Sequence, residues 1–420
     1  MLIKTLLNKR YKFKSFVYGA VRFLGEELEV ELKARKNSKP ECHCCGYRGG
    51  IYDRVKERRY EFVPLWGLRV FFIYKPRRVN CPRCGVRVER VPWAQGKNQE
   101  TKMYKLFLSH WARKLSWQDV AREFQSTWQQ VFRAIEYVVE WGKEHRDLSN
   151  ITAIGVDEIQ VRSGHHYLTI VYQIDYHCRR LLWVGEKRTA KTFLGFFRMM
   201  GKERCSRIEY VCSDMWKAYL KVIKKKIPNA IHILDRFHIV ANLNKAVNEV
   251  RAEEHKRLAK DGYEPVLKGS RWCLLKKPEN LTEKQSYTLK ELLKYNLKSV
   301  RAYLLKEDFQ QFWQYTSPYW AQQFLQAWCN RAMRSKIEPI KKQARSIRAH
   351  QDLILNWFRA KKLFNSGIVE GFNCKAKLTI RKAFGFRTQY ALEIALFHQL
   401  GALPEPTIIH RFWCGGCSFN

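Results

Sequence analysis

Hydrophobic and polar residues repeat with different periods in successive parts of the chain. Near the start, short apolar runs such as residues 70–74 lie between basic residues and predict strands. Further on, apolar residues at helical spacing predict helices, and one central segment alternates between the two patterns. We therefore distinguish, in order, 1–98 (short strands), 99–148 (helices), 149–240 (strands and helices in alternation), 241–360 (almost wholly helical), 361–400 (helical) and 401–420 (an irregular tail).

The central segment has acidic residues in or directly after predicted strands. Residues 151–161 form an apolar run that contains Asp157, and burying a lone carboxylate is costly unless it is paired or binds a metal. A later apolar run is followed at once by Asp214, and a further short run ends at Asp235. The predicted order of three strands, helix, strand, helix and strand resembles the RNase H-like fold. In that fold the strands that carry Asp157 and Asp214 are neighbours.

The chain of 420 residues is strongly basic, with 78 Lys and Arg against 39 Asp and Glu and a formal charge of +39. This charge favours nucleic acid as the partner, because phosphate contacts release counterions and supply much of the affinity. Every apolar run falls short of the roughly 20 residues that span a bilayer, and residues 1–14 lack the apolar centre of a secretory signal. We expect a cytoplasmic protein that binds double-stranded DNA and does not associate with membranes.

Two Cys-x-x-Cys pairs lie in the first region, and each is followed directly by glycine. In a reducing cytosol such pairs bind a metal more often than they form disulfides. A tight turn after each pair lets backbone N–H groups face the thiolates, and four thiolates suit one tetrahedral zinc ion. We predict a zinc ribbon at about 40–90 with structural Zn²⁺ bound by Cys42, Cys45, Cys81 and Cys84. Unrelated buried cysteines are the alternative.

Three further cysteines and one histidine bear on this assignment. His43 and Cys44 lie inside the first pair and are alternative ligands. Cys414 and Cys417 form another pair in the tail, without a second pair nearby, and we interpret them as incidental.

Residues 115–135 predict two helices joined by a short turn. Ser116 can cap the first helix, with Asp119 three residues further on, and Ser126 or Thr127 can cap the second. These features predict a helix-turn-helix, although a helical hairpin that only packs would show the same pattern.

The second of these helices has an apolar face and a polar face. Trp128 begins the set at helical spacing that we expect to face inward. Polar side chains near the start of the helix then point outward, and their types suit base edges and phosphates in a major groove. The predicted DNA-contacting residues are Thr127, Gln129, Gln130 and Arg133.

A third acidic residue of interest lies far along the chain. Glu370 occupies a predicted helix, and residues at spacings of three and four continue its face. A carboxylate followed by amide and basic groups suits a metal ion together with DNA backbone, whereas a solvated helix face is the usual interpretation of such a pattern. The face comprises Glu370, Asn373, Lys377 and Arg381.

Taken together, these features resemble bacterial insertion-sequence transposases of the DDE class, and among them the ISL-three family. The resemblance covers nearly the whole chain and rests on an ordered set of short motifs. These lie at 42–45, 81–84, 155–158, 212–219, 235–238, 367–373 and 381–387. The resemblance implies a multidomain α+β chain with a zinc ribbon, a helix-turn-helix and an RNase H-like α/β core. An all-α insertion, 241–360, would interrupt that core before its last part, 361–400.

The resemblance also implies roles for individual residues. Asp157, Asp214 and Glu370 would be the catalytic triad that holds two Mg²⁺ (or Mn²⁺) ions, which activate the attacking oxygen and stabilise the leaving oxygen. Asp235 and His238 would be accessory, with a helix-capping Asp and a packed His as the alternative. The DNA-contacting residues of the last region would be Asn373, Lys377, Arg381 and Arg387.

The family implies an enzyme that binds the inverted-repeat ends of its element, cuts them and joins them to target DNA. Because two ends must be paired, we expect a homodimer on DNA, associated with the bacterial nucleoid. One rival is a non-catalytic zinc-ribbon and helix-turn-helix regulator derived from a transposon. Another is an RNase H-like nuclease that cuts without joining.

Overall fold

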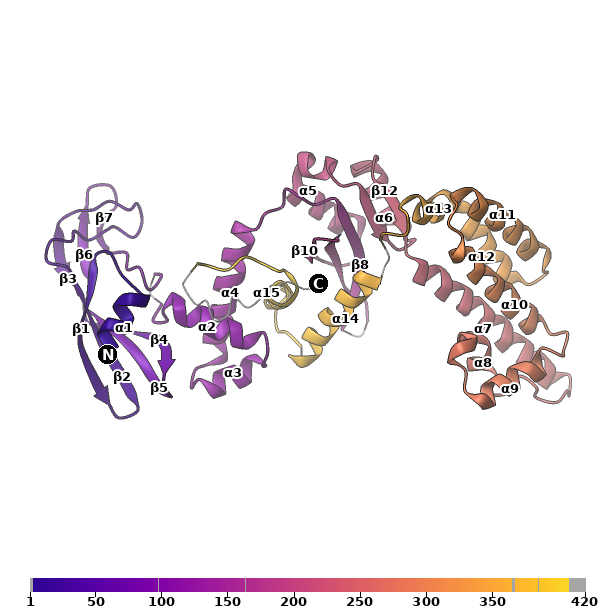
Figure 1. Cartoon of the computed structure of the whole chain (residues 1–420), viewed down its shortest axis with the longest axis horizontal. Coiled ribbons are helices and arrows are strands. Elements are labelled where there is room, and N and C mark those ends of the chain that lie inside the picture. Colours follow the sequence, from indigo (N-terminus) through magenta and orange to yellow (C-terminus); the bar gives the residue numbers. More distant parts are fainter. Residues whose placement is uncertain (1–2, 97, 163, 365–366, 384, 408–420) are drawn as a thin grey trace. The chain divides into compact units, whose positions relative to one another are not determined.

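The structure is a computed structural model that describes residues 3–96, 98–162, 164–364, 367–383 and 385–407 (Figure 1). The chain forms two compact units. The first comprises residues 1–146 together with 378–420, and the second comprises residues 147–377. We expected residues 361–400 to form one part of the core, whereas the boundary between the units falls inside this range.

The first unit begins with a short helix and two β-sheets. Helix α1 (Ile3–Arg10) precedes a four-stranded sheet in the order β1-β2-β5-β4, in which β2 and β5 are parallel and the other pairs antiparallel. In a second, three-stranded antiparallel sheet, β3-β6-β7, the first strand precedes β4 and β5 in the chain and the other two follow them. The strands are β1 (Phe16–Leu24), β2 (Glu27–Ala34), β3 (Ile51–Arg54), β4 (Arg58–Leu65), β5 (Leu68–Tyr74), β6 (Arg77–Cys81) and β7 (Gly85–Val88).

Aromatic side chains fill the core of the four-stranded sheet. Trp93 is fully buried, with ring centroids 4.9 Å from Phe16 and 5.3 Å from Tyr74. Phe62 and Phe72 stack with centroids 4.4 Å apart on neighbouring strands β4 and β5. Large rings bury much apolar area each, so this core stabilises a region of short strands.

The described part of the first unit also contains helices α2 (Lys102–Ala112), α3 (Trp117–Glu123), α4 (Trp128–His145) and α15 (Gln389–Leu400). The predicted caps are confirmed, because the side chain of Ser116 accepts from the backbone of α3 and that of Thr127 from the backbone of α4. Helix α15 packs on the others, with Ser109 Oγ 2.9 Å from His398 Nε2 and Lys143 Nζ 2.8 Å from Glu393 Oε1.

The second unit begins with a five-stranded sheet in the order β10-β9-β8-β11-β12. Strands β8, β9 and β10 form an antiparallel meander, and β11 is parallel to both of its neighbours. The elements are β8 (Ala153–Arg162), β9 (His166–Asp175), β10 (Cys178–Glu186), α5 (Ala190–Ser206), β11 (Tyr210–Ser213), α6 (Lys217–Lys226) and β12 (Ile231–Leu234). The predicted order of strands and helices is confirmed.

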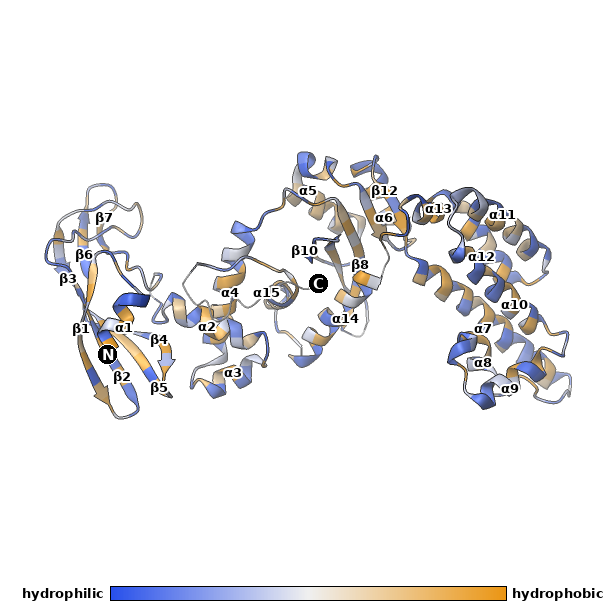
Figure 2. Cartoon of the chain, in the orientation of Figure 1, coloured by the Kyte–Doolittle hydropathy of each residue, from blue (hydrophilic) through white to orange (hydrophobic). Residues whose placement is uncertain are grey.

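Apolar side chains on one face of this sheet pack against α5 and α6. Phe193, Phe196 and Tyr219 are fully buried there, together with Val156 and Val211 of the strands. Figure 2 shows the strands of this sheet as hydrophobic along much of their length. Strands buried on both faces have such continuous apolar runs.

A helical region follows β12 directly. Its helices are α7 (Arg236–Lys260), α8 (Arg271–Leu275), α9 (Glu283–Leu292), α10 (Lys298–Gln310), α11 (Pro318–Arg334), α12 (Glu338–Ala349) and α13 (Gln351–Arg359), with short 3₁₀ turns at Pro278–Asn280 and Gln311–Gln314. The prediction of a nearly all-helical region is confirmed, although its first helix begins before residue 241. Phe309, Phe312 and Trp328 form its aromatic core. Helix α14 (Gly367–Lys382) comes next.

Side chains of α7 and α13 make polar contacts that stabilise this region. Glu254 of α7 accepts hydrogen bonds from the backbone N–H groups of Lys298 (2.9 Å) and Ser299 (2.7 Å), and so caps the start of α10. Asn356 of α13 donates to the backbone oxygen of His232 on β12 at 2.8 Å. In the described part of the chain, none of the helices combines the length and apolar composition that crossing a bilayer requires.

Candidate functional site

Three acidic residues lie at the same edge of the second unit's sheet. Gly155 on β8 pairs with Cys212 on β11, so Asp157 and Asp214 each lie two residues beyond a paired position. Asp235 continues this row, because its backbone N–H donates to the oxygen of Ser213 at 2.9 Å. Neighbouring strands are about 4.8 Å apart, so this register places the three residues next to one another along a row that crosses the strands.

Helix α14 is joined to this edge by a hydrogen bond between distant parts of the chain. Asn373 Nδ2 donates to Asp157 Oδ2 at 2.6 Å, and Tyr172 Oη donates to Asn373 Oδ1 at 2.9 Å. The ring of Tyr172 also stacks on Phe372, with centroids 4.9 Å apart. Asn373 is therefore buried and engaged at both ends of its amide. We predicted that it contacts DNA, but the structure turns its side chain toward the sheet.

Glycine at position 155 permits this close approach of α14. A Cβ atom at Gly155 would lie 2.4 Å from Cγ2 of Val369, a distance that side chains do not tolerate. Because side chains alternate along a strand, Asp157 projects from the same face as Gly155. Helix α14 thus covers the face of β8 from which Asp157 projects.

Glu370 lies on α14 three residues before Asn373, and its side chain is exposed. Three residues of helix rise by about 4.5 Å, so Glu370 is one turn away from the residue that is bonded to Asp157. Among the described residues, the carboxylates of Asp157, Asp214 and Glu370 do not form a group in which all lie within 4.8 Å of one another. The structure therefore places the predicted triad in one region without bringing it into contact.

Burial and mutual repulsion raise the pKa values of Asp157 and Glu158. Burial raises the pKa of Asp157, and the charges of Asp214 and Asp235 raise it further, whereas a hydrogen bond from the N–H of Glu158 and the charge of His238 lower it. Burial likewise raises the pKa of Glu158 to about 7, with a contribution from Asp214. Crowded carboxylates of this kind favour a bound cation.

A cation of the protein itself contacts this acidic group. Arg188 forms ion pairs with Glu158 and with Asp214, the latter at 3.2 Å, and its guanidinium lies 4.7 Å from the ring centre of Trp216. The signal for this role was present in the sequence, since Arg188 follows a strand that ends at the same edge as Asp157.

Asp235 and His238 flank the start of α7. Asp235 is the N-cap of this helix and accepts from the N–H of Phe237 at 2.7 Å, so the capping interpretation of Asp235 is confirmed. His238 Nε2 lies 3.6 Å from Asp235 Oδ2, and the His238 side chain is 41% exposed rather than packed. The ring therefore remains accessible beside Asp157, whose pKa it lowers.

A buried Ser–His pair, which the sequence analysis did not identify, supports the end of β11. Ser213 Oγ lies 2.7 Å from His232 Nε2 and donates to the backbone oxygen of Asp214 at 2.9 Å. Burial lowers the pKa of His232 to about 4, so its ring is neutral near pH 7. The backbone of His232 is in turn held by Asn356, which connects Asp214 to the helical region.

The basic residues of the last region are on the surface. Lys377 and Arg381 are exposed on α14, and Arg387 is exposed after it. The polar face that we expected on α14 is therefore only partly a surface, since Asn373 of the same set is buried.

The predicted DNA-contacting residues of α4 have mixed environments. Gln129 is exposed, and Arg133 is exposed but paired with Glu100 at 3.0 Å. The side chains of Thr127 and Gln130 form a capping box with each other's backbone. The prediction that Trp128 faces inward was wrong, because this first residue of the helix is 42% exposed.

The four predicted cysteines of the first unit come together. The sulfur atoms of Cys42, Cys45, Cys81 and Cys84 all lie within 4.8 Å of one another, and those of Cys45 and Cys81 are 3.5 Å apart. Four sulfurs at about 2.3 Å from a tetrahedral zinc would be about 3.8 Å apart, so the arrangement fits such an ion. His43 lies outside this group, with Nδ1 3.0 Å from the oxygen of Val88.

The thiols of this cluster differ in acidity. The backbone N–H of Cys45 lowers the pKa of Cys42 to about 6, as expected of a Cys-x-x-Cys turn. Hydrogen bonding to Cys45 raises the pKa of Cys84 to about 12. Four thiolates therefore do not coexist near pH 7 unless a cation compensates their charge. Cys414 and Cys417 lie outside the described residues.

The acidic edge of the sheet, the distant helix bonded to it and the basic composition are together consistent with a transposase. A family model described as a transposase matches residues 154–396, a range that contains Asp157, Asp214 and Glu370. The chain is 31% identical over 368 residues to the transposase for insertion sequence element IS1001 of Bordetella parapertussis, covering 87% of this chain and 89% of that protein. It is 30% identical over 416 residues to the transposase for IS1557 of Mycobacterium tuberculosis, covering 92% and 91%. The chain belongs to the ISL3 (ISL-three) family of insertion-sequence transposases.

Proposed function

We propose that this transposase cuts DNA at the inverted-repeat ends of an insertion sequence and joins the freed ends to target DNA. Asp157, Asp214 and Glu370 are the residues that would hold the divalent metal ions. The observation that carries the proposal is the 2.6 Å hydrogen bond from Asn373 to Asp157, which joins the helix of Glu370 to the sheet of the other two carboxylates. We infer that this sheet and its distant helix form an RNase H-like core, which the helical region interrupts.

The donor set fits magnesium or manganese. Carboxylate oxygens are the hard ligands that these ions prefer. Burial raises the pKa of Asp157, repulsion from Asp214 and Asp235 raises it further, and a bound cation would offset both effects. Two such ions, when bound, stabilise both the attacking and the leaving oxygen of a phosphodiester exchange.

The chain's own residues hold this site in shape. Asn373 fixes Asp157 Oδ2, while the backbone N–H of Glu158 fixes Oδ1 at 2.8 Å. The backbone N–H of Trp216 fixes Asp214 Oδ1 at 3.0 Å. The oxygens that accept these bonds each keep a second lone pair for a metal, so the two aspartates are oriented before an ion binds.

For the first unit we propose recognition of DNA. The cysteine cluster would bind zinc as a ribbon, and α3 and α4 would act as a helix-turn-helix. Gln129 and Arg133 are its exposed polar residues near the start of α4. Two copies of the chain would pair the two ends of the element.

Incubation with labelled duplex DNA that carries an element end, in the presence of Mg²⁺, tests the proposal. The parent should yield a cleaved product and a joined product. Asp157→Asn should bind the DNA normally and yield neither, whereas Asp261→Asn, an exposed change at the end of α7, should behave as the parent.

The same assay separates the rivals. Binding without cutting by the parent would indicate a regulator, and cutting without joining would indicate a nuclease. Cleavage retained by Asp157→Asn would refute the proposed triad.

A further inference from the structure

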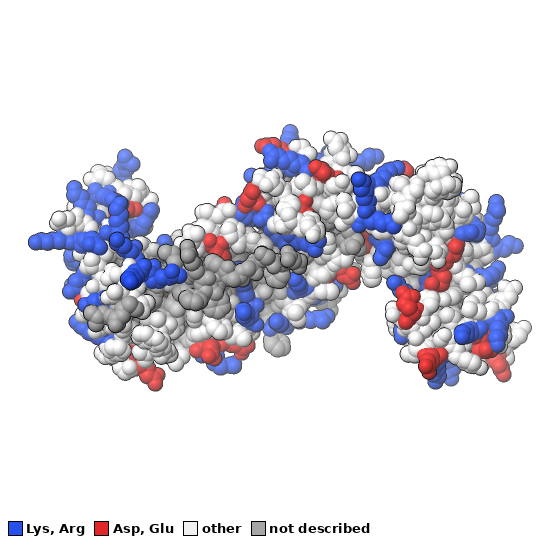
Figure 3. Space-filling view, viewed as in Figure 1, with Lys and Arg blue, Asp and Glu red and all other residues white. Residues whose placement is uncertain are grey.

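A small hollow of about 180 Å³ lies beside the cysteine cluster of the first unit. Its walls come from the start of β1, the segment before Cys42, and the strands around β6 and β7. Ligand pockets usually measure roughly 300–1,000 Å³, so this one suits a single small group. In the face seen in Figure 3, Lys and Arg side chains gather over the part of the chain that contains β6 and β7.

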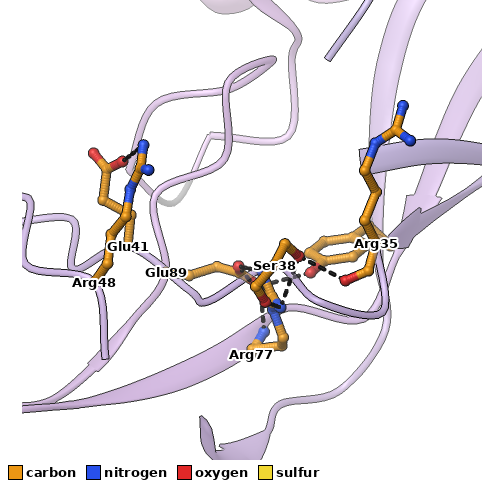
Figure 4. A network of polar contacts seen from close by, with 7 residues as sticks. Arg35, Ser38, Glu41, Arg48, Arg77 and Glu89 are labelled. Atoms are coloured by element: carbon orange, nitrogen blue, oxygen red, sulfur yellow. Dashed lines mark hydrogen bonds and ion pairs between the residues drawn. The ribbon is translucent and has the colours of Figure 1, made fainter. Parts of the chain in front are cut away.

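A buried ion pair is part of the lining of this hollow, and Figure 4 shows its polar contacts. Arg77 Nη2 lies 2.7 Å from Glu89 Oε2, and both side chains are almost fully buried. Arg77 Nη1 also donates to the backbone oxygen of Ser38 at 2.6 Å, and Tyr74 Oη donates to Glu89 Oε1 at 2.6 Å. The pair is neutral as a unit and its groups are satisfied, so it shapes the hollow rather than attracting a ligand.

Four other cations line the hollow, and two of them pair with its one remaining acidic side chain. Arg48 and Arg90 each lie 3.4 Å from a carboxylate oxygen of Glu41, longer than the roughly 2.8 Å of a strong charge-assisted bond. Lys14 and Lys39 are exposed, and the described residues include no ion-pair partner for either. With four cations against the one carboxylate of Glu41, the hollow keeps a net positive charge of three, and a better anion could recruit its two arginines.

The cysteine cluster fixes two walls of the hollow. Glu41 directly precedes Cys42, and Cys42 pairs with Glu89 in a backbone bridge. The N–H of Arg90 also donates to the backbone oxygen of Glu41 at 2.7 Å. The positions of Glu41 and Arg90 thus depend on the geometry of the cluster.

We propose that this hollow binds a phosphate of the DNA backbone, with Arg48, Arg90, Lys14 and Lys39 as its ligands. Guanidinium groups match phosphate oxygens in pairs, and a phosphate would displace the carboxylate of Glu41 from the two arginines. Phosphate contacts carry no sequence information, so the hollow would position the first unit on DNA rather than read it. The inference rests on the proposed function only in taking DNA as the partner.

Binding of the full chain to a duplex of arbitrary sequence, measured by fluorescence anisotropy without Mg²⁺ over a series of salt concentrations, tests this. Each phosphate contact contributes about 0.9 to the slope of log K against log salt. The double variant Lys14→Gln with Lys39→Gln should weaken binding and lower this slope by about one to two. The matched variant Lys256→Gln with Lys260→Gln, which removes two exposed lysines from α7, should leave the slope unchanged. Equal losses in both variants, or none in the first, would overturn the proposal.

A second variant predicts a change of opposite sign. Glu41→Gln removes the carboxylate that competes for Arg48 and Arg90, so binding should tighten and the slope should rise. Weaker or unchanged binding by a folded Glu41→Gln protein would contradict the assignment. Because the assay needs neither an element end nor a metal ion, a failure of strand cleavage would leave its result intact.

Discussion

Asn373 donates a hydrogen bond to Asp157 although 216 positions separate the two residues along the chain. The helical region that lies between them leaves the sheet after β12 and returns through α13, whose Asn356 bonds to β12. The hydrogen bond is thus the closing contact of a long excursion. It sets the position of Glu370, one turn earlier on the same helix, relative to the acidic sheet edge.

Replacing Asn373 by Ala should therefore weaken both the fold and the site. Tyr172 and Asp157 would each lose a buried partner, which costs about 1–3 kcal/mol of unfolding free energy. Denaturant unfolding should show this loss, and strand cleavage should fall more than DNA binding does. Asn280→Ala, at an exposed position of a 3₁₀ turn, should change neither quantity. Parent-like cleavage by Asn373→Ala would show that the bond does not position the site.

Arg188 should compete with metal ions for the acidic edge. Its guanidinium compensates Asp214 and Glu158, so Arg188→Gln should bind Mn²⁺ more tightly than the parent in the absence of DNA. Titration calorimetry measures this affinity directly. Arg207→Gln removes an exposed arginine that pairs with Glu203 on the surface, and it should leave the affinity unchanged. An unchanged or weaker affinity for Arg188→Gln would contradict the prediction.

Substitution of a cysteine in the cluster should release zinc, whereas substitution of Cys44 should not. Cys81→Ser removes a buried member of the cluster and should release the bound zinc, as measured by elemental analysis of the purified protein. Cys44→Ser should retain one zinc per chain, because the Cys44 side chain is exposed and lies outside the group. Loss of zinc from Cys44→Ser would instead indicate that Cys44 is a zinc ligand.

Acid should destabilise the first unit through His398. Burial lowers the pKa of this residue to about 3, below its ordinary 6.5, so the unfolded chain binds a proton more readily than the folded one. The contribution of His398 to stability is complete above pH 6.5 and is lost as pH falls toward 3. Between pH 7 and 5 this loss is on the order of 1–2 kcal/mol. Denaturant unfolding at both pH values should show a smaller loss for His398→Gln than for the parent, whereas exposed His165→Gln should match the parent. Equal acid sensitivity of all three proteins would contradict this assignment.

Local patterns in the sequence predicted much of this structure. Short apolar runs predicted the strands of the second unit. Ser116 and Thr127, whose side chains accept from backbone N–H groups three residues further on, predicted where two helices begin. The cysteine cluster was predictable because Cys-x-x-Cys turns form locally. In these cases the determining contacts are short-range or follow from a known ligand geometry.

Features that depend on long-range contacts were not predictable in this way. The inward orientation of Asn373 depends on Tyr172 and Asp157, which are distant in sequence. Helix α15 belongs to the first unit because of partners such as Ser109, and its own sequence gives no sign of them. Trp128 is exposed because it is the first residue of its helix, although its spacing matches the buried face.

The central claim is that Asp157, Asp214 and Glu370 bind the same pair of metal ions. Anomalous diffraction from crystals of the protein with Mn²⁺ and DNA carrying an element end tests it most directly. We predict two manganese peaks about 3.5–4 Å apart, with oxygen atoms of all three carboxylates as ligands. Manganese bound without Glu370, or at a site away from Asp157 and Asp214, would contradict the account.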